Sequence, residues 1–141
     1  MAKKFGSYAV FSAVRHWFEK ETEWYWDIKP ATSGMELAMD RLYLDNRILL
    51  ASDGSRLEKP VSRSEVMHRE IALTFGGTNI VDEDGKLILE EGAPVAKVEE
   101  VLRQMPHQMV VEIWQAIGEA NPKWGPVKDP NAPILGRNEM I

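Results

Sequence analysis

The acidic residues of one turn come nearest to a recognisable chemical site, because their spacing resembles part of a calcium-binding loop. When Gly85 takes the place of the loop's invariant glycine, Asp82 and Asp84 fall at ligand positions and Glu91 falls at the last one. The first ligand position would then be Ile80, which has no side-chain oxygen. An EF-hand also needs a helix that leads directly into the loop, and a glycine pair interrupts the chain there. We therefore predict a solvated acidic turn and no metal site.

The histidines and serines have no spacing typical of catalysis. His16, His68 and His107 lack the spacing of metal ligands, and we interpret them as surface or boundary residues. Ser33 and Ser62 are each followed three residues later by a glutamate, which is the capping box at the start of a helix. The chain has no cysteine, so thiolate chemistry is excluded. We predict a protein that is not an enzyme and that carries no cofactor.

Apolar side chains are the better candidates for binding chemistry. Trp114 lies within a helical apolar stripe, which favours a place in the core. Trp124 lies in a proline-rich segment without periodicity, so it either packs back on the domain or anchors a partner. Methionines on helical stripes offer adaptable surfaces for helical partners. The candidate partner-binding residues are Trp124, Ile134, Leu135, Trp114, Met35, Met39 and Met109.

Length and composition predict one globular domain inside a cell. A chain of 141 residues can bury a real core, and its 44% hydrophobic and 28% charged residues are ordinary for a globular protein. The net charge of −5 argues against binding to nucleic acid, which needs clustered lysine and arginine. No apolar run approaches the roughly 20 residues of a membrane span.

Four helices are predicted from apolar periodicity and from their capping residues. The stretch around Pro106 contains two apolar stripes at helical spacing, and the proline separates them. The two capping boxes begin two earlier helices. The predicted helices cover residues 34–45, 63–75, 94–105 and 107–119.

Two hairpins are also predicted. Trp24, Trp26 and Ile28 alternate with polar residues, which is the pattern of a half-buried strand. The segment 8–20 alone is compatible with a helix or a strand, but the strand needs a partner, so we predict a hairpin over residues 14–29. Segments 78–81 and 86–89 predict a second, short hairpin around the acidic turn, after Gly76-Gly77 has ended the preceding helix.

These elements predict a mainly helical α+β fold. We expect a single globular domain over residues 1–121, followed by a proline-rich tail over 122–141 that is disordered or extended. Because the tail carries Trp124, Ile134 and Leu135, we expect it to contribute to association with a partner and not to the stability of the domain.

The order of elements resembles that of a known family. The aromatic stretch RHWFEKETEWYWDIKP precedes the helical stretch MELAMDRLYL, and a VDEDGK turn is later followed by a small helix, a proline and an amphipathic helix. This arrangement resembles the small tail assembly chaperones of long-tailed bacteriophages and prophages. The resemblance covers residues 15–43 and 75–122, whereas the stretch 49–61 has no counterpart.

The resemblance implies a binding protein that keeps the tape measure protein soluble while the tail tube protein polymerises around it. It implies a place in the host cytoplasm and absence from the mature virion. In this family a longer form is often made by ribosomal frameshifting, and a homo-oligomer is a further possibility. Two alternatives stay open: a structural connector or baseplate component of the phage particle, and a small inhibitor or enzyme of another type.

Overall fold

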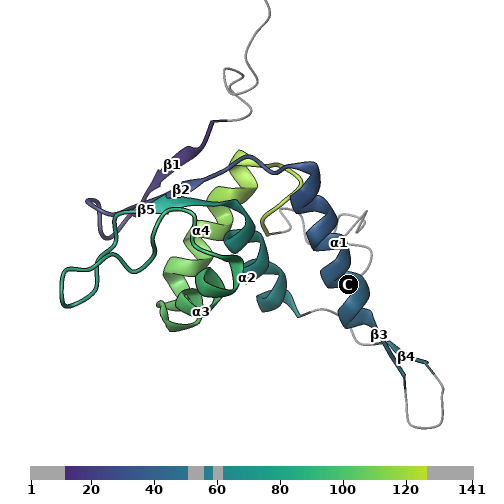
Figure 1. Ribbon diagram of the computed structural model, residues 1–141. Coiled ribbons are helices and arrows are strands. Elements are labelled where there is room, and N and C mark those ends of the chain that lie inside the picture. Colours follow the sequence, from purple (N-terminus) through teal and green to yellow (C-terminus); the bar gives the residue numbers. More distant parts are fainter. Residues whose placement is uncertain (1–11, 51–55, 59–61, 127–141) are drawn as a thin grey trace, which may run out of the picture.

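The protein has an α+β fold in which a small antiparallel sheet packs on helices, as the sequence predicted (Figure 1). The computed structural model describes residues 12–50, 56–58 and 62–126. Along these residues the elements are β1 (Val14–Trp17), β2 (Tyr25–Ile28), α1 (Ser33–Arg47), β3 (Ile48–Leu50), β4 (Arg56–Glu58), α2 (Arg63–Thr74), β5 (Phe75–Thr78), α3 (Val95–Gln104) and α4 (His107–Ala120).

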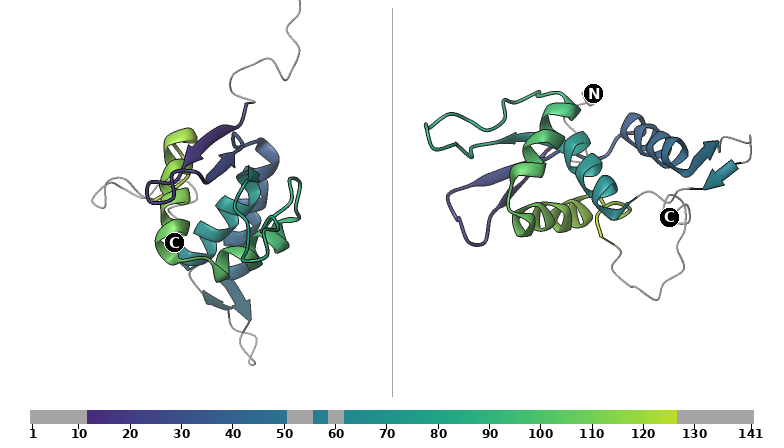
Figure 2. Two further views of the ribbon diagram at one scale, coloured as in Figure 1. Left: turned by 90° about the vertical axis from the view of Figure 1, so that its left-hand side faces the viewer. Right: turned by 90° about the horizontal axis from the view of Figure 1, so that it is seen from below.

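The second helix, α2, is central to this arrangement. It packs against α3 and α4 on one side and against α1 on the other, and both Figure 1 and the view from below in Figure 2 show this order. The helix α4 also contacts β1 and β2. The core therefore lies around α2, between the sheet and the other helices.

The predicted hairpin over residues 14–29 is confirmed. Strands β1 and β2 pair antiparallel, with Val14 opposite Ile28 and His16 opposite Trp26. Trp26 and Ile28 are buried, while Tyr25 and Asp27 alternate with them on the outer face, as the period of two requires. Residues 14–17 are thus a strand, and residues 8–11 of the ambiguous segment lie outside the described residues.

A third strand was not predicted. We expected Gly76-Gly77 only to end the preceding helix, but Phe75–Thr78 continues directly as β5 and pairs with β2. A side chain at position 76 would place its Cβ 3.1 Å from the backbone oxygen of Asp27, so glycine permits this close approach. A hairpin alone is only marginally stable in water, and β5 supplies the third strand that stabilises it.

The predicted second hairpin is reduced to a single bridge, between Val81 and Leu87. The turn between them is closed by the carboxylate of Asp82, whose Oδ1 accepts hydrogen bonds from the backbone N–H groups of Asp84 (2.8 Å) and Lys86 (3.0 Å). A different hairpin, β3–β4, follows α1, and all of it except Ile48 lies in the stretch 49–61 that had no counterpart in the family pattern.

The helix boundaries follow local capping chemistry with one correction. Ser62 accepts a hydrogen bond from the backbone N–H of Glu65, as its capping box predicted. At the start of α1, however, the hydroxyl of Thr32 accepts the bond from Met35, so Thr32 takes the role that we expected of Ser33. The break at Pro106 is confirmed, because α3 ends before it and α4 begins after it.

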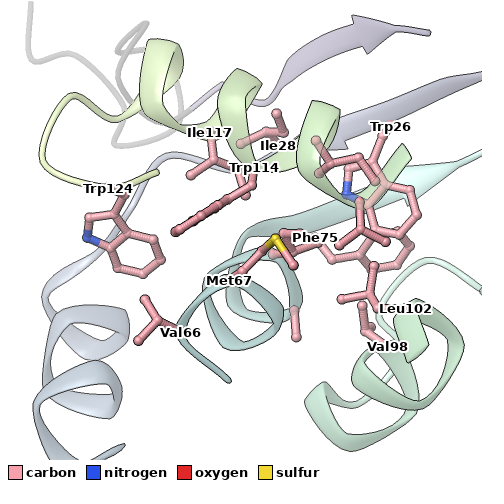
Figure 3. Packing of buried hydrophobic residues seen from close by; sticks show 14 of the residues in the cluster. Trp26, Ile28, Val66, Met67, Phe75, Val98, Leu102, Trp114, Ile117 and Trp124 are labelled. Carbon is pink, nitrogen blue, oxygen red and sulfur yellow. The ribbon is translucent and has the colours of Figure 1, made fainter. Parts of the chain in front are cut away.

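The core combines side chains from β2, β5 and the four helices, and Figure 3 shows part of it. Trp26 and Phe75 lie with their ring centroids 4.9 Å apart, which joins β2 to β5. Trp114 is buried, as its helical stripe predicted, and Figure 3 shows it between Met67 and Trp124.

The segment after α4 packs on the domain, which corrects the expected boundary after residue 121. Trp124 is only 2% exposed, and its Nε1 donates a hydrogen bond to the carboxylate of Glu36 on α1. The backbone N–H of Gly125 donates to Glu70 of α2, and the side-chain oxygen of Asn121 accepts from Ala31. Residues up to 126 therefore belong to the fold, while 127–141 lie outside the described residues.

Two glycines allow this segment to approach α4. Gly125 has a positive φ of 83°, and a Cβ added there would lie 2.5 Å from the Cα of Gly118. Gly118 in turn faces the backbone oxygen of Trp124. Any side chain at position 125 would therefore force the backbones apart and would strain its own conformation.

We predict that Trp124→Ala lowers the free energy of unfolding by about 3–5 kcal/mol, because it removes a large buried side chain. Gly125→Ala should also destabilise the protein, whereas Pro122→Ala, at an exposed position, should change the stability by less than about 0.5 kcal/mol. Urea denaturation of the three variants measures these differences. A loss below about 1 kcal/mol for Trp124→Ala would show that the segment is peripheral.

A second prediction concerns pH. Partial burial of His68 and then the nearby Arg103 lower the pKa of this imidazole from its ordinary value. The unfolded chain therefore binds this proton more tightly than the folded protein does. The contribution to stability is fully present above a pH of about 6.5 and is lost as the pH falls through the lowered pKa.

We expect that His68→Gln flattens the fall in stability below a pH of about 6.5. The comparison is a series of urea denaturation curves at several pH values, and Gln115→Ala, at an exposed residue that does not titrate, is the control. Identical pH profiles for the wild type and His68→Gln would refute this assignment.

Candidate functional site

An apolar groove lies between the loop that joins β5 to α3 and the surface of α3. Its volume is about 800 Å³. We call it the α3 groove and define it by Trp24, Leu87, Ile88, Val101, Met105 and Met109, which contribute its apolar lining. The loop extends beyond the sheet at the left of Figure 1, with α3 below it. A concave apolar surface of this size can accept a segment of a partner protein.

The loop is held in place by its own side chains. Ile80 and Leu89 are buried in the core, and the backbone N–H of Ile88 donates to the oxygen of Ile80 at 3.0 Å. Exposure falls along the run Leu87-Ile88-Leu89, in which Leu87 is 43% exposed beside the groove, Ile88 is half-buried and Leu89 is buried. The run therefore does not alternate as an extended strand would.

A second hollow adjoins the groove at the corner between α3 and α4. It has a volume of about 480 Å³ and lies between α4 and the turn that follows β1. Pro106 and Met109 line both hollows, so the two hollows meet at the corner that the proline creates. Met109 is half-buried and has a flexible thioether side chain that can adjust to different contacts.

The rim of the α3 groove is charged with both signs. Its ionisable residues are Asp82, Lys86, Glu90, Lys97 and Glu100. Lys97 and Glu100 are both more than half exposed and their charged atoms lie 4.0 Å apart, so their pairing contributes little to stability. Such a rim can pair with charges of either sign on a partner while the apolar lining contacts its hydrophobic face.

Of the candidate binding residues that the structure describes, only Met109 lines this groove. Trp114, Trp124 and Met39 are buried in the core, so their side chains are not accessible to a partner in this structure. Met35 is half-buried on α1 and packs against the core away from the groove. Ile134 and Leu135 lie outside the described residues.

Sequence reasoning missed part of the lining. We expected Trp24 to share the buried face of the strand with Trp26 and Ile28, yet it is only half-buried and contributes to the groove. We also interpreted residues 86–89 as a plain strand. Strand alternation gave no signal for the exposure of Leu87, because it would place Leu87 on the same face as the buried Leu89.

The polar contacts near these hollows connect elements of the fold. Nε2 of His16 contacts the carboxylate of Glu112 on α4, and this carboxylate also accepts a hydrogen bond from the backbone N–H of Glu19 at 3.2 Å. These contacts of His16 and Glu19 with Glu112 fasten the first hairpin to α4.

Within residues 12–50, 56–58 and 62–126, there is no group of three or more histidine, aspartate or glutamate side chains that could hold a metal ion. No helix in this part of the chain is long and apolar enough to span a membrane.

Comparisons with protein-family models, curated proteins and solved structures found no significant match. The resemblance to tail assembly chaperones therefore stays a prediction from the order of elements in the sequence.

Proposed function

We propose that the protein is a tail assembly chaperone of a long-tailed bacteriophage or prophage, which binds the tape measure protein and keeps it soluble. The observation that supports this proposal is the α3 groove, with its methionines, its tryptophan and its charged rim. We place the protein in the host cytoplasm during tail assembly. The tail tube protein is the second partner that the resemblance implies.

The groove suits one amphipathic helix of an elongated, apolar-rich client. A client helix presents apolar side chains at positions i, i+3, i+4 and i+7, which can enter a hydrophobic groove. Met105 and Met109 both line that groove, and their side chains can repack around different apolar residues. A chaperone that binds many successive segments of one long helical chain needs this adaptability more than it needs a single tight fit.

The overall charge supports the same role. A client rich in apolar residues tends to associate with itself, and a net charge of −5 on the bound chaperone opposes that association. The rim charges keep the edge of the complex hydrated.

A structural connector or baseplate component is the alternative within the same setting. The two functions differ in where the protein is found. A chaperone is absent from purified particles, whereas a structural component is present in them at a fixed number of copies. Mass spectrometry of purified particles separates the two.

Our third prediction tests the groove with two leucines of similar exposure. Leu87 lines the α3 groove and is 43% exposed, while Leu37 on α1 is 51% exposed and lies outside the groove. Leu87→Glu should weaken binding to a tape measure segment by about tenfold or more, since it puts a charge where an apolar helix docks. Leu37→Glu should leave binding unchanged.

The measurement is co-expression with a segment of the tape measure protein encoded in the same genome, followed by assay of its soluble fraction and of the affinity of the purified pair. Equal binding by the two variants would place the client elsewhere on the surface. Failure of the wild-type protein to bind or solubilise the segment would overturn the proposed function itself.

A further inference from the structure

Strand β1 is an open edge of the three-stranded sheet. The strand order is β1-β2-β5, so β1 pairs on one side only within the described part of the chain, and Figure 1 shows it as the outermost strand. Three of its four residues are exposed, in contrast to β5 at the opposite edge, which is mostly buried. Val14 and Trp17 are 52% and 51% exposed. Exposed apolar residues on an edge strand favour pairing with another chain.

The register shows which backbone groups face outward. The backbone N–H of Phe18 donates to the oxygen of Trp24, so position 18 is directed toward β2. In an antiparallel pair the direction alternates, and positions 14 and 16 therefore face β2 as well. The N–H and C=O groups of Arg15 and Trp17 point to the free edge.

The charge on β1 does not protect this edge. Natural edge strands are often guarded by a charged side chain that points outward. Here the guanidinium of Arg15 lies back over β2, with its Nε 2.9 Å from Asp27 and its Cζ 3.6 Å from the centroid of the Tyr25 ring. This side chain therefore does not cover the backbone of the edge. The ring of Trp17 is half exposed and packs edge-on against Tyr25, with their centroids 5.4 Å apart.

We propose that a second copy of this chain pairs antiparallel with β1 and joins the two sheets into one of six strands. The two-fold axis passes through His16, which places Arg15 opposite the partner's Trp17 on the outer face. Because both positions face the free edge, each of the two Arg15–Trp17 pairs exchanges two backbone hydrogen bonds.

This register is self-complementary, which a two-fold interface requires. An axis at Arg15 would place two guanidinium groups opposite each other, whereas the axis at His16 places each Arg15 opposite an aromatic residue. The guanidinium of Arg15 stays over the Tyr25 ring of its own chain, so the backbone hydrogen bonds carry the pairing. Four residues of strand bury less surface than a standard interface, and we expect a weak dimer that depends on concentration.

Our fourth prediction is tested by sedimentation equilibrium of the full-length chain over a series of concentrations. The wild type should approach twice the chain mass at the highest concentrations. Val14→Lys should raise the dissociation constant at least about tenfold, because a charge on an edge strand opposes pairing. The matched control is Val81→Lys, at a valine that is 41% exposed on the loop, and it should leave association unchanged.

A second pair of variants separates the contribution of the backbone to the dimer from that of the side chain. Arg15→Pro removes an N–H group that faces the free edge and should weaken the dimer more than Arg15→Ala, which keeps that group. Circular dichroism verifies that each variant is folded. A protein that is monomeric at every concentration, or a dimer that Val14→Lys does not weaken, would overturn this proposal. Neither result bears on client binding, which is measured separately.

Discussion

The buried carboxylate of Glu70 is the interaction on which the packing of this protein depends. Glu70 is fully buried on α2, and its Oε1 accepts hydrogen bonds from Trp114 Nε1 at 2.9 Å and from the backbone N–H of Gly125 at 2.8 Å. A carboxylate costs much free energy to bury unless it is hydrogen-bonded, so both donors must stay in place. The central helix is thereby tied to α4 and to the segment that follows it.

The same helix also connects the helices to the sheet without an intervening loop. The hydroxyl of Thr74 donates to the backbone oxygen of Glu70 at 2.7 Å, and the next residue, Phe75, begins β5. The backbone N–H of Lys29, just after β2, donates to the oxygen of Thr74. The end of α2 is therefore fixed by its own last turn and by the sheet, and the position of the hairpin follows from the position of α2.

Local signals in the sequence were sufficient to predict most of the helices and the first hairpin. The period of two around Trp26, the capping by Ser62 and the break at Pro106 each depend on a few neighbouring residues, and each is found in the structure. Strand β5 was missed because glycines in a strand are acceptable only where another backbone lies close, and that neighbour is remote in sequence.

Burial of Trp124 could not be predicted for a related reason. A tryptophan outside a periodic segment has the same local sequence whether it packs inward or anchors a partner. The decision depends on Glu36 and Glu70, which lie 88 and 55 residues away from their partners Trp124 and Gly125. The α3 groove could not be predicted for the same reason, because it combines Trp24, a loop and the corner at Pro106, which are distant in sequence.

The first hairpin carries residues of both proposed surfaces, and this links their geometry. Trp24, just before β2, lines the α3 groove, while Trp17 on β1 borders the free edge. The contact of His16 with Glu112 fastens the hairpin to α4, whose Met109 completes the groove. A dimer joined at β1 would therefore hold two grooves in a fixed relation to each other. On a client with many similar helical segments, the second groove would bind at a raised effective concentration, so two weak sites would hold one long chain more firmly than either alone.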